Sequence, residues 1–73
     1  MKVVRKKILP KYFVEVVEKN KNFELRKDDD DIQVGDKLIL SEWNGNCYTG
    51  KSVTRTVIAR GLLYHWVVVY ALS

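Results

Sequence analysis

The amino-acid sequence predicts an α+β domain that is mostly β: a small curved sheet or β-barrel of about five strands with one main α-helix. Only the segment from residue 9 to residue 19 carries apolar residues at helical spacing. The later apolar segments are short and rich in β-branched and aromatic residues, which favour strands. A chain of 73 residues has room for a single domain, residues 1–73, with one core. We therefore expect a strongly curved sheet with the helix at one end.

The first strand is expected at Lys2–Ile8, and the helix follows at Pro10–Lys19. Proline suits the first turn of a helix, where its missing N–H costs no hydrogen bond. The apolar residues that would face the core are spaced at i, i+4, i+7 and i+8: Leu9, Phe13, Val16 and Val17. Asn20 tolerates a left-handed backbone and is therefore a suitable end for the helix.

Four more strands are expected after the helix. They are Phe23–Lys27, Lys37–Trp43, Val53–Arg60 and Tyr64–Leu72. Residues 28–31 and 44–51, rich in Asp, Asn or Gly, predict loops, and turns are expected at Val34-Gly35-Asp36 and at Gly61. The last strand is apolar on both faces, which is typical of a central strand.

The charge and cysteine content narrow the possible environments. The 13 basic and 9 acidic residues give a net charge of +4, which permits phosphate binding but does not demand it. The single cysteine, Cys47, excludes an internal disulfide, so a reducing cytoplasm is expected. The basic segment Met1–Lys7 is not followed by the apolar stretch of a signal peptide, and no segment is long enough to span a membrane.

The segment Lys21–Lys27 is the best candidate for a binding site. It alternates with a period of two, so that Phe23 and Leu25 share one face and Glu24 and Arg26 share the other, with a lysine at each end. One interpretation is an ordinary solvated face, whose salt bridges contribute about 0–1 kcal/mol. The other is a cleft that holds a polar, anionic ligand.

Four segments of the chain together resemble a known family. They are Leu9–Phe13, Phe23–Lys27, Val34–Asp36 and Tyr48–Gly50. The pattern resembles a family of unknown function in the ASCH division of the PUA-like superfamily, found in bacteria and phages. That superfamily's central motif is Gly-x-Lys-x-x-Glu-x-Arg, which Lys21, Glu24 and Arg26 match. The resemblance implies a small PUA-like, ASCH-type β-barrel with a cleft beside its helix, and RNA as the ligand.

The site residues that this resemblance implies are five. They are Lys21, Glu24, Arg26, Tyr12 and Lys27. Arg26 offers a planar fork of donors and Lys21 a mobile point charge. Glu24 can hold Arg26 in place or accept a hydrogen bond from an amino group on a base, and Tyr12 would reach the cleft from the first helical turn.

Two departures from the family pattern bear on function. The close family often carries Asn-Asp-Arg where this chain has Asp28-Asp29-Asp30, so an acidic residue replaces a basic one beside the cleft. The nucleoside-hydrolysing relatives carry a catalytic Thr where this chain has Glu24, so no catalytic residue is assigned.

Three functions therefore stay open. The first is a small binding module for RNA or a modified nucleotide, with no enzymatic activity expected. The second is a hydrolase acting on RNA or a modified nucleoside. The third is a phage accessory protein that binds another protein, which a contiguous exposed apolar patch would indicate.

No metal and no cofactor are expected. The aspartates of 28–31 do not follow the alternating ligand spacing of a calcium loop, so a solvated acidic loop is the preferred interpretation. One cysteine and one histidine, His65, cannot assemble a tetrahedral zinc site. Of the two tryptophans, Trp66 is expected in the core, and Trp43, which borders a loop, could stack on a base.

A basic patch is expected around the first strand. It comprises Lys2, Arg5, Lys6 and Lys7, with Lys11 from the helix. Charged side chains on an edge strand discourage aggregation, which is one explanation for the patch. The other is a sequence-independent attraction for phosphate.

Overall fold

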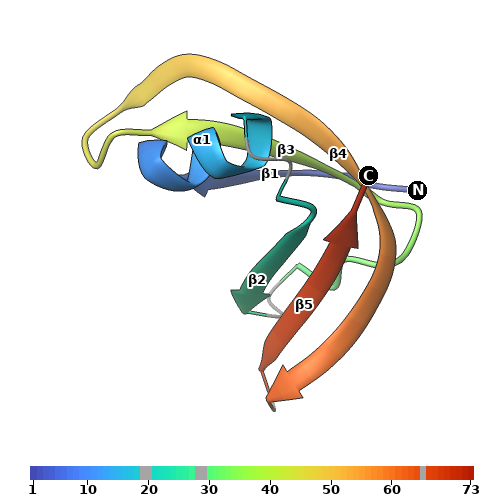
Figure 1. The fold of residues 1–73 in the computed structure, drawn as a ribbon. Helices are drawn as coiled ribbons and strands as arrows, with labels where there is room; N and C mark the ends of the chain where they lie inside the picture. Colours follow the sequence, from blue (N-terminus) through green and yellow to red (C-terminus); the bar gives the residue numbers. More distant parts are fainter. Residues whose placement is uncertain (19–20, 28–29, 65) are drawn as a thin grey trace.

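The computed structural model describes residues 1–18, 21–27, 30–64 and 66–73, and contains five strands and one helix within them (Figure 1). In chain order these are β1 (Val3–Ile8), α1 (Pro10–Glu18), β2 (Phe23–Lys27), β3 (Lys37–Trp43), β4 (Tyr48–Tyr64) and β5 (Val67–Leu72). The predicted fold class, mostly β with one main helix, is confirmed. The described helix has nine residues, and no helix in the described part of the chain is long and apolar enough to cross a membrane.

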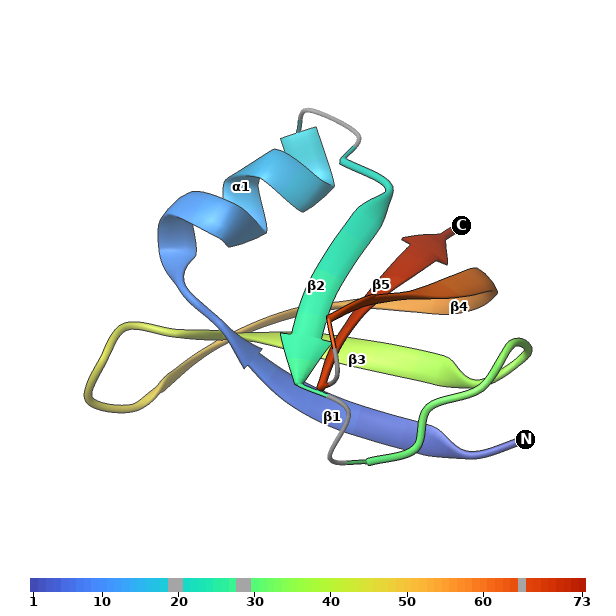
Figure 2. The same ribbon diagram turned by 90° about the horizontal axis from the view of Figure 1, so that it is seen from below.

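The five strands form one sheet in the order β1-β3-β4-β5-β2. β1 pairs with β3 in parallel, and the other neighbours are antiparallel. β4 is 17 residues long and serves both halves of the sheet, because its first half pairs with β3 and its second half with β5. Figure 1 shows β4 as an arch, with α1 on its concave side, and Figure 2 shows β1 and β3 side by side in the view from below. The sheet is therefore strongly curved.

The hydrophobic core lies on the concave side of this arch. Its buried members are Ile8, Phe13, Val16, Ile32, Leu38, Leu40, Val57, Val68, Tyr70 and Leu72. Two of the four predicted helix contacts, Phe13 and Val16, are among them, whereas Leu9 and Val17 are 46% and 43% exposed. The nine-residue helix covers only one end of the sheet, so the strip that it buries is narrower than its apolar stripe.

Two predicted breaks within β4 are wrong. The loop predicted at 44–51 is shorter, because the Asn44 side chain accepts hydrogen bonds from the N–H groups of Asn46 and Cys47, both at 2.9 Å, and closes a tight turn. Gly61 is not a turn but pairs with Val69 inside the strand, so β4 continues to Tyr64. The predicted last strand consequently begins late, at Val67. The predictions for Lys19, Asn20 and His65 concern residues outside those that the structure describes.

The predicted Val34-Gly35-Asp36 turn ties the start of β1 to β3 and β4. Gly35 has a φ of 95° and donates to the Val57 carbonyl at 2.8 Å. The Asp36 carboxylate accepts hydrogen bonds from the backbone N–H groups of Gln33, at 2.8 Å, and Lys2, at 2.9 Å. The bond from Gln33, and then that from Lys2, holds the pKa of this carboxyl below its ordinary value of 3.8.

This pKa shift predicts a specific pH dependence of stability. A carboxyl whose pKa is lowered by folding stabilises the folded state above its ordinary pKa, and this contribution is lost as the pH falls through the folded pKa. Asp36→Asn should therefore lower the melting temperature at about pH 7 and lower it less near pH 2. Thermal melts of the two proteins at both pH values check this. An equal melting temperature at about pH 7 would show that the turn does not depend on the charge.

Candidate functional site

The two edge strands, β1 and β2, approach each other at a seam that side chains span. The sheet order places β1 and β2 at opposite edges, so no ladder of backbone hydrogen bonds joins them. Arg26 on β2 instead donates from Nη2 to the carbonyl of Lys7 on β1 at 2.8 Å. Lys6 on β1 also forms an ion pair with Asp30, just after β2. The curved sheet is thus closed by side chains at this one place.

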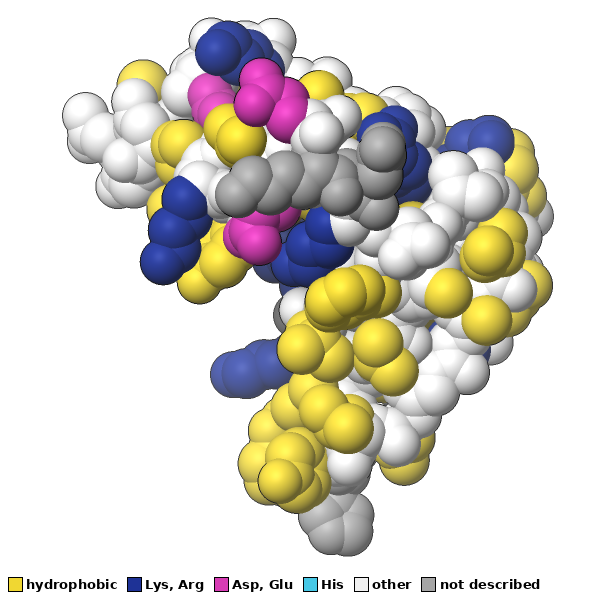
Figure 3. All heavy atoms as spheres, in the orientation of Figure 1, with side chains coloured by type: hydrophobic (Ala, Val, Ile, Leu, Met, Phe, Trp, Pro, Cys, Tyr) yellow, Lys and Arg dark blue, Asp and Glu magenta, His cyan; other side chains and the backbone are white. Residues whose placement is uncertain are grey.

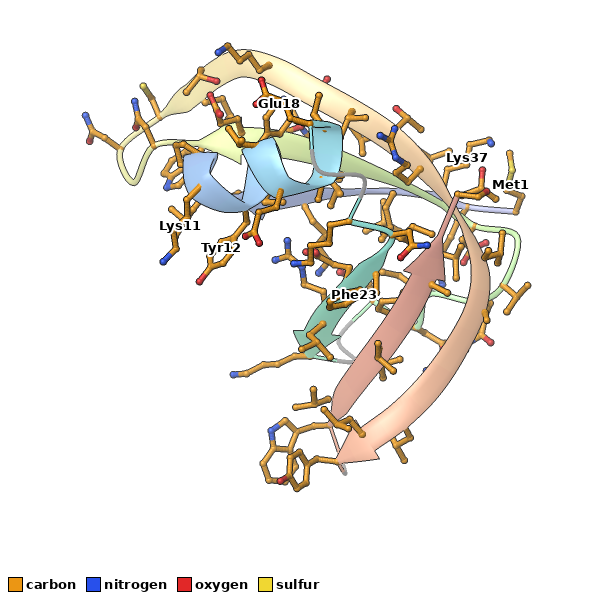
Figure 4. The ribbon with its side chains drawn as sticks, viewed as in Figure 1. Met1, Lys11, Tyr12, Glu18, Phe23 and Lys37 are labelled. Carbon is orange, nitrogen blue, oxygen red and sulfur yellow. The ribbon has the colours of Figure 1, made fainter. Side chains whose placement is uncertain are left out.

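A pocket of about 410 Å³ lies at the seam, beside the first turn of α1. It is lined by Lys7, Ile8, Leu9, Tyr12, Lys21, Glu24, Leu25 and Arg26. Figure 4 shows Tyr12 pointing from α1 toward the space beside β2, and Figure 3 shows acidic and basic side chains meeting below the helix. Lys21 and Arg26, predicted around one cleft, both line this pocket.

The Glu24–Arg26 pair forms one wall of the pocket. Arg26 donates to Oε2 of Glu24 from Nε at 2.8 Å and approaches the same oxygen with Nη2 at 2.6 Å. Glu24 is only 5% exposed. Its second oxygen, Oε1, and Nη1 of Arg26 have no hydrogen-bond partner among the described residues. The pair therefore retains one acceptor and one donor group for another molecule.

The charged face of β2 points inward and its apolar face points outward. Glu24 is buried and Arg26 half-buried, whereas Phe23 is 47% and Leu25 50% exposed. An ordinary half-buried strand has the opposite arrangement, because burying a charge is costly unless it is paired. The predicted alternation is correct, but the interpretation of its charged side as a solvated face is wrong.

Lys21 places a cation between two aromatic rings at the mouth of the pocket. Its Nζ lies 5.5 Å from the ring centroid of Tyr12 and 5.1 Å from that of Phe23. Its backbone N–H donates to the carbonyl of Glu15 at 3.0 Å, which fixes it to the helix. Among the described residues no carboxylate lies within ion-pair distance of Lys21, so its charge is available to an anion.

Four of the five predicted site residues line the pocket, and Lys27 does not. Lys27 lies on the same exposed, apolar side of β2 as Phe23 and Leu25, because residues two apart on a strand share a face. The pocket also includes Lys7 and Leu9 from the β1–α1 junction, which were not among the predicted site residues. The sequence placed Lys7 in the basic patch and Leu9 on the apolar stripe of the helix, and neither pattern indicated the pocket.

The acidic segment after β2 has a structural role in its described part. Besides the Lys6–Asp30 ion pair, the carbonyl of Asp31 accepts a hydrogen bond from Nζ of Lys2, and the Asp31 carboxylate lies 4.0 Å from Arg60. Both aspartates are exposed, as predicted for a solvated loop, and they also join this segment to β1 and β4. Asp28 and Asp29 lie outside the described residues. No group of three metal-ligating side chains occurs in the described ranges.

Trp66 is a further correction, since it is 60% exposed and does not belong to the core. It follows the end of β4, where the β4–β5 hairpin projects from the domain. Trp43 is half-buried and packs edge-on against Tyr48, with ring centroids 5.0 Å apart.

The fold and the pocket together define a small, mostly β domain with a charged cleft at the seam of its sheet. A family model described as "Domain of unknown function (DUF3850)" matches residues 4–69, and the chain belongs to this family. The chain is also 37% identical over 71 residues to an "Uncharacterized 12.9 kDa protein in GpA 3'region" of Escherichia phage P2. This alignment covers 97% of the chain and 65% of the relative, so the chain spans about two thirds of the relative's length.

The geometry of the seam generates a prediction for the stability of an Arg26 variant. An exposed arginine could be removed without cost, but Arg26→Ala would leave the buried Glu24 carboxylate unpaired and the Lys7 carbonyl without its donor. We expect a loss of about 1–3 kcal/mol in the free energy of unfolding. Urea denaturation measures this loss.

The control is the double variant Glu24→Leu/Arg26→Met, which removes both charges and keeps apolar bulk. Because replacing a buried ion pair by apolar side chains is often neutral, the double variant should be more stable than Arg26→Ala. A single variant as stable as the unmodified protein would show that the pair does not hold the seam.

Proposed function

We propose that this domain is a small binding module for RNA or a modified nucleotide, which it holds in the pocket at the seam. The observation that carries the proposal is the buried Glu24–Arg26 pair, whose Oε1 and Nη1 remain unused beside the pocket. Apolar residues of similar size would often be at least as stable as such a pair. Its presence on the inner face of β2 therefore favours a binding role.

Each group in the pocket suits one part of a nucleotide. Oε1 of Glu24 can accept from an amino or imino N–H of a base, and Nη1 of Arg26 can donate to a neighbouring carbonyl or ring nitrogen. The ring of Tyr12 offers a stacking surface, and Lys21 offers a charge for a phosphate. The volume, about 410 Å³, lies within the range of roughly 300–1,000 Å³ found for small-molecule sites.

The resemblance to the ASCH division of the PUA-like superfamily supports the same function, since the curved sheet with a cleft beside its helix is the arrangement which that resemblance implies. A cytoplasmic location accords with an RNA or nucleotide ligand.

The hydrolase alternative is less favoured, because no Ser, Thr, Cys or His is among the described residues that line the pocket. Among the described lining residues Lys7, Tyr12, Lys21 and Glu24 could act as nucleophile or base, and Glu24 already holds Arg26.

The proposal predicts that Lys21 recognises the phosphate of a nucleotide. Lys21→Ala should weaken the binding of nucleoside monophosphates roughly tenfold or more, since a hydrogen bond to a charged group contributes about 1.5–3 kcal/mol. The binding of the matching nucleosides should change little. The melting temperature should stay nearly constant, because Lys21 forms no ion pair with a described carboxylate. Titration calorimetry with all four nucleotides and nucleosides measures these affinities.

The matched control is Lys27→Ala, which removes the same charge at the exposed end of β2, outside the pocket. It should leave nucleotide affinity unchanged. If neither nucleotides nor short RNA bind the unmodified protein at low salt, the proposal fails and the protein-binding alternative leads.

That alternative is favoured by one specific observation, an exposed apolar patch on the β2–β5 half. It comprises Phe23, Leu25 and Tyr64, which are 47–68% exposed and share one face of the sheet, because Val67 pairs with both Lys27 and Tyr64. Figure 3 shows hydrophobic side chains gathered over this half of the molecule. Large apolar patches on a domain surface often mark sites of protein association. We propose as a second candidate function that a protein partner covers this patch.

Site-specific photo-crosslinking in cells that produce the chain tests this second function. A photoreactive residue at Tyr64 should give a discrete crosslinked protein. The matched position is Val34, which is 58% exposed and lies outside the patch, in the turn before β3. The same crosslinked species from both positions, or none from Tyr64, would contradict a partner specific to the patch.

A further inference from the structure

The cations of this chain are divided between two sides of the sheet. The ion pairs between described residues lie on the concave side and at the seam: Lys2–Asp36, Lys6–Asp30, Arg26–Glu24 and Arg60–Asp31. Arg5, Lys7 and Lys37 form no ion pair with a described carboxylate. The alternation of β1 thus separates the predicted basic patch into a paired set and an unpaired set.

Arg5, Lys7 and Lys37 lie on one continuous surface, which we call the outer face: the convex side of β1, β3 and the first half of β4. The strand register places Lys37 beside Val3, and Arg5 beside Ile39. Hydroxyl side chains occupy every second position of β4 from residue 52 to residue 56. None of the described side chains on this face is acidic, so its positive charge is not neutralised locally.

Two aromatic residues, Trp43 and Tyr48, lie at the end of the outer face next to the β3–β4 turn, and a basic side chain lies over the ring of each. Nζ of Lys7 lies 4.0 Å from the ring centroid of Trp43, and the guanidinium of Arg5 lies 4.4 Å from that of Tyr48. Arg5 also donates from Nε to the hydroxyl of Ser41 at 2.9 Å, which fixes the guanidinium over the ring. Tyr48 is 41% exposed, so part of its ring is open to a ligand.

From this arrangement we infer that the outer face binds single-stranded RNA. Cations at alternate positions of β1 are about 6.6–6.8 Å apart, and with Lys37 they form a row that can follow a phosphate backbone. Tyr48 and Trp43 supply a surface on which a base stacks without regard to sequence. The hydroxyls of β4 can bind the 2′-hydroxyl, which distinguishes RNA from DNA. This surface does not include the buried Glu24–Arg26 pair. Lys7 borders both the outer face and the pocket, whereas Arg5, Lys37 and Tyr48 do not line the pocket.

The test is fluorescence anisotropy of a short labelled oligouridylate titrated with the full chain at several salt concentrations. Tyr48→Ala should weaken binding roughly 5- to 150-fold, and Tyr48→Phe, which keeps the ring, should not. Lys7→Gln and Lys37→Gln should each reduce the steepness of the log–log salt dependence by about 0.7. Lys27→Gln, a matched loss of charge outside this face, should leave that slope unchanged.

If the Tyr48→Ala protein does not fold, the inference is tested by a fluorescence measurement on a protein whose outer face is unmodified. In a Trp66→Phe background, Trp43 is the one remaining tryptophan, and oligouridylate should quench its emission. Absence of quenching, or equal weakening by Lys27→Gln and Lys7→Gln, would overturn the inference. So would equal affinity for the deoxy oligomer. If Lys21→Ala abolishes oligomer binding while the outer-face variants bind normally, the strand is bound at the pocket and the outer face is not a site.

Discussion

The contact between Arg26 and the Lys7 carbonyl is the constraint on which the rest of this structure depends. β1 and β2 are the two edges of the sheet, so this contact and the Lys6–Asp30 ion pair join segments that no backbone ladder connects. Glu24 fixes the guanidinium by binding it through a single oxygen. The same three groups thus close the fold and form the wall of its pocket, so stability and recognition share the same atoms.

This sharing explains why the charged strand is inverted. A solvated edge would carry Glu24 and Arg26 outside and bury Phe23 and Leu25. Here the edge must reach across a seam, and only a long side chain with several donors can do so. The apolar side chains are consequently on the outside, where they form part of the exposed patch on the β2–β5 half. The orientation of β2 therefore creates both the polar pocket and the exposed apolar surface.

The sequence predicted those parts of the fold that local pattern determines. Phe23–Lys27 and Lys37–Trp43 have the predicted bounds, since alternation or apolar content defines them within a few residues. Gly61 was misjudged because glycine permits a turn without requiring one, and cross-strand pairing with Val69 decides its conformation. The grouping of Tyr12, Lys21, Glu24 and Arg26 was also predictable. The direction of the charged face was not, since it depends on β1 lying across the seam, 19 residues away in sequence.

The uninterrupted course of β4 has a consequence for how the domain loses its structure. Because one strand belongs to both halves of the sheet, neither half can separate from the other without breaking ladders along the same backbone. The register shift between Val57 and Ala59 is the point where the arch can bend, as bulges increase local twist. Small openings of the seam would then be elastic motions about this point, and larger ones would unfold the whole domain as a single cooperative unit.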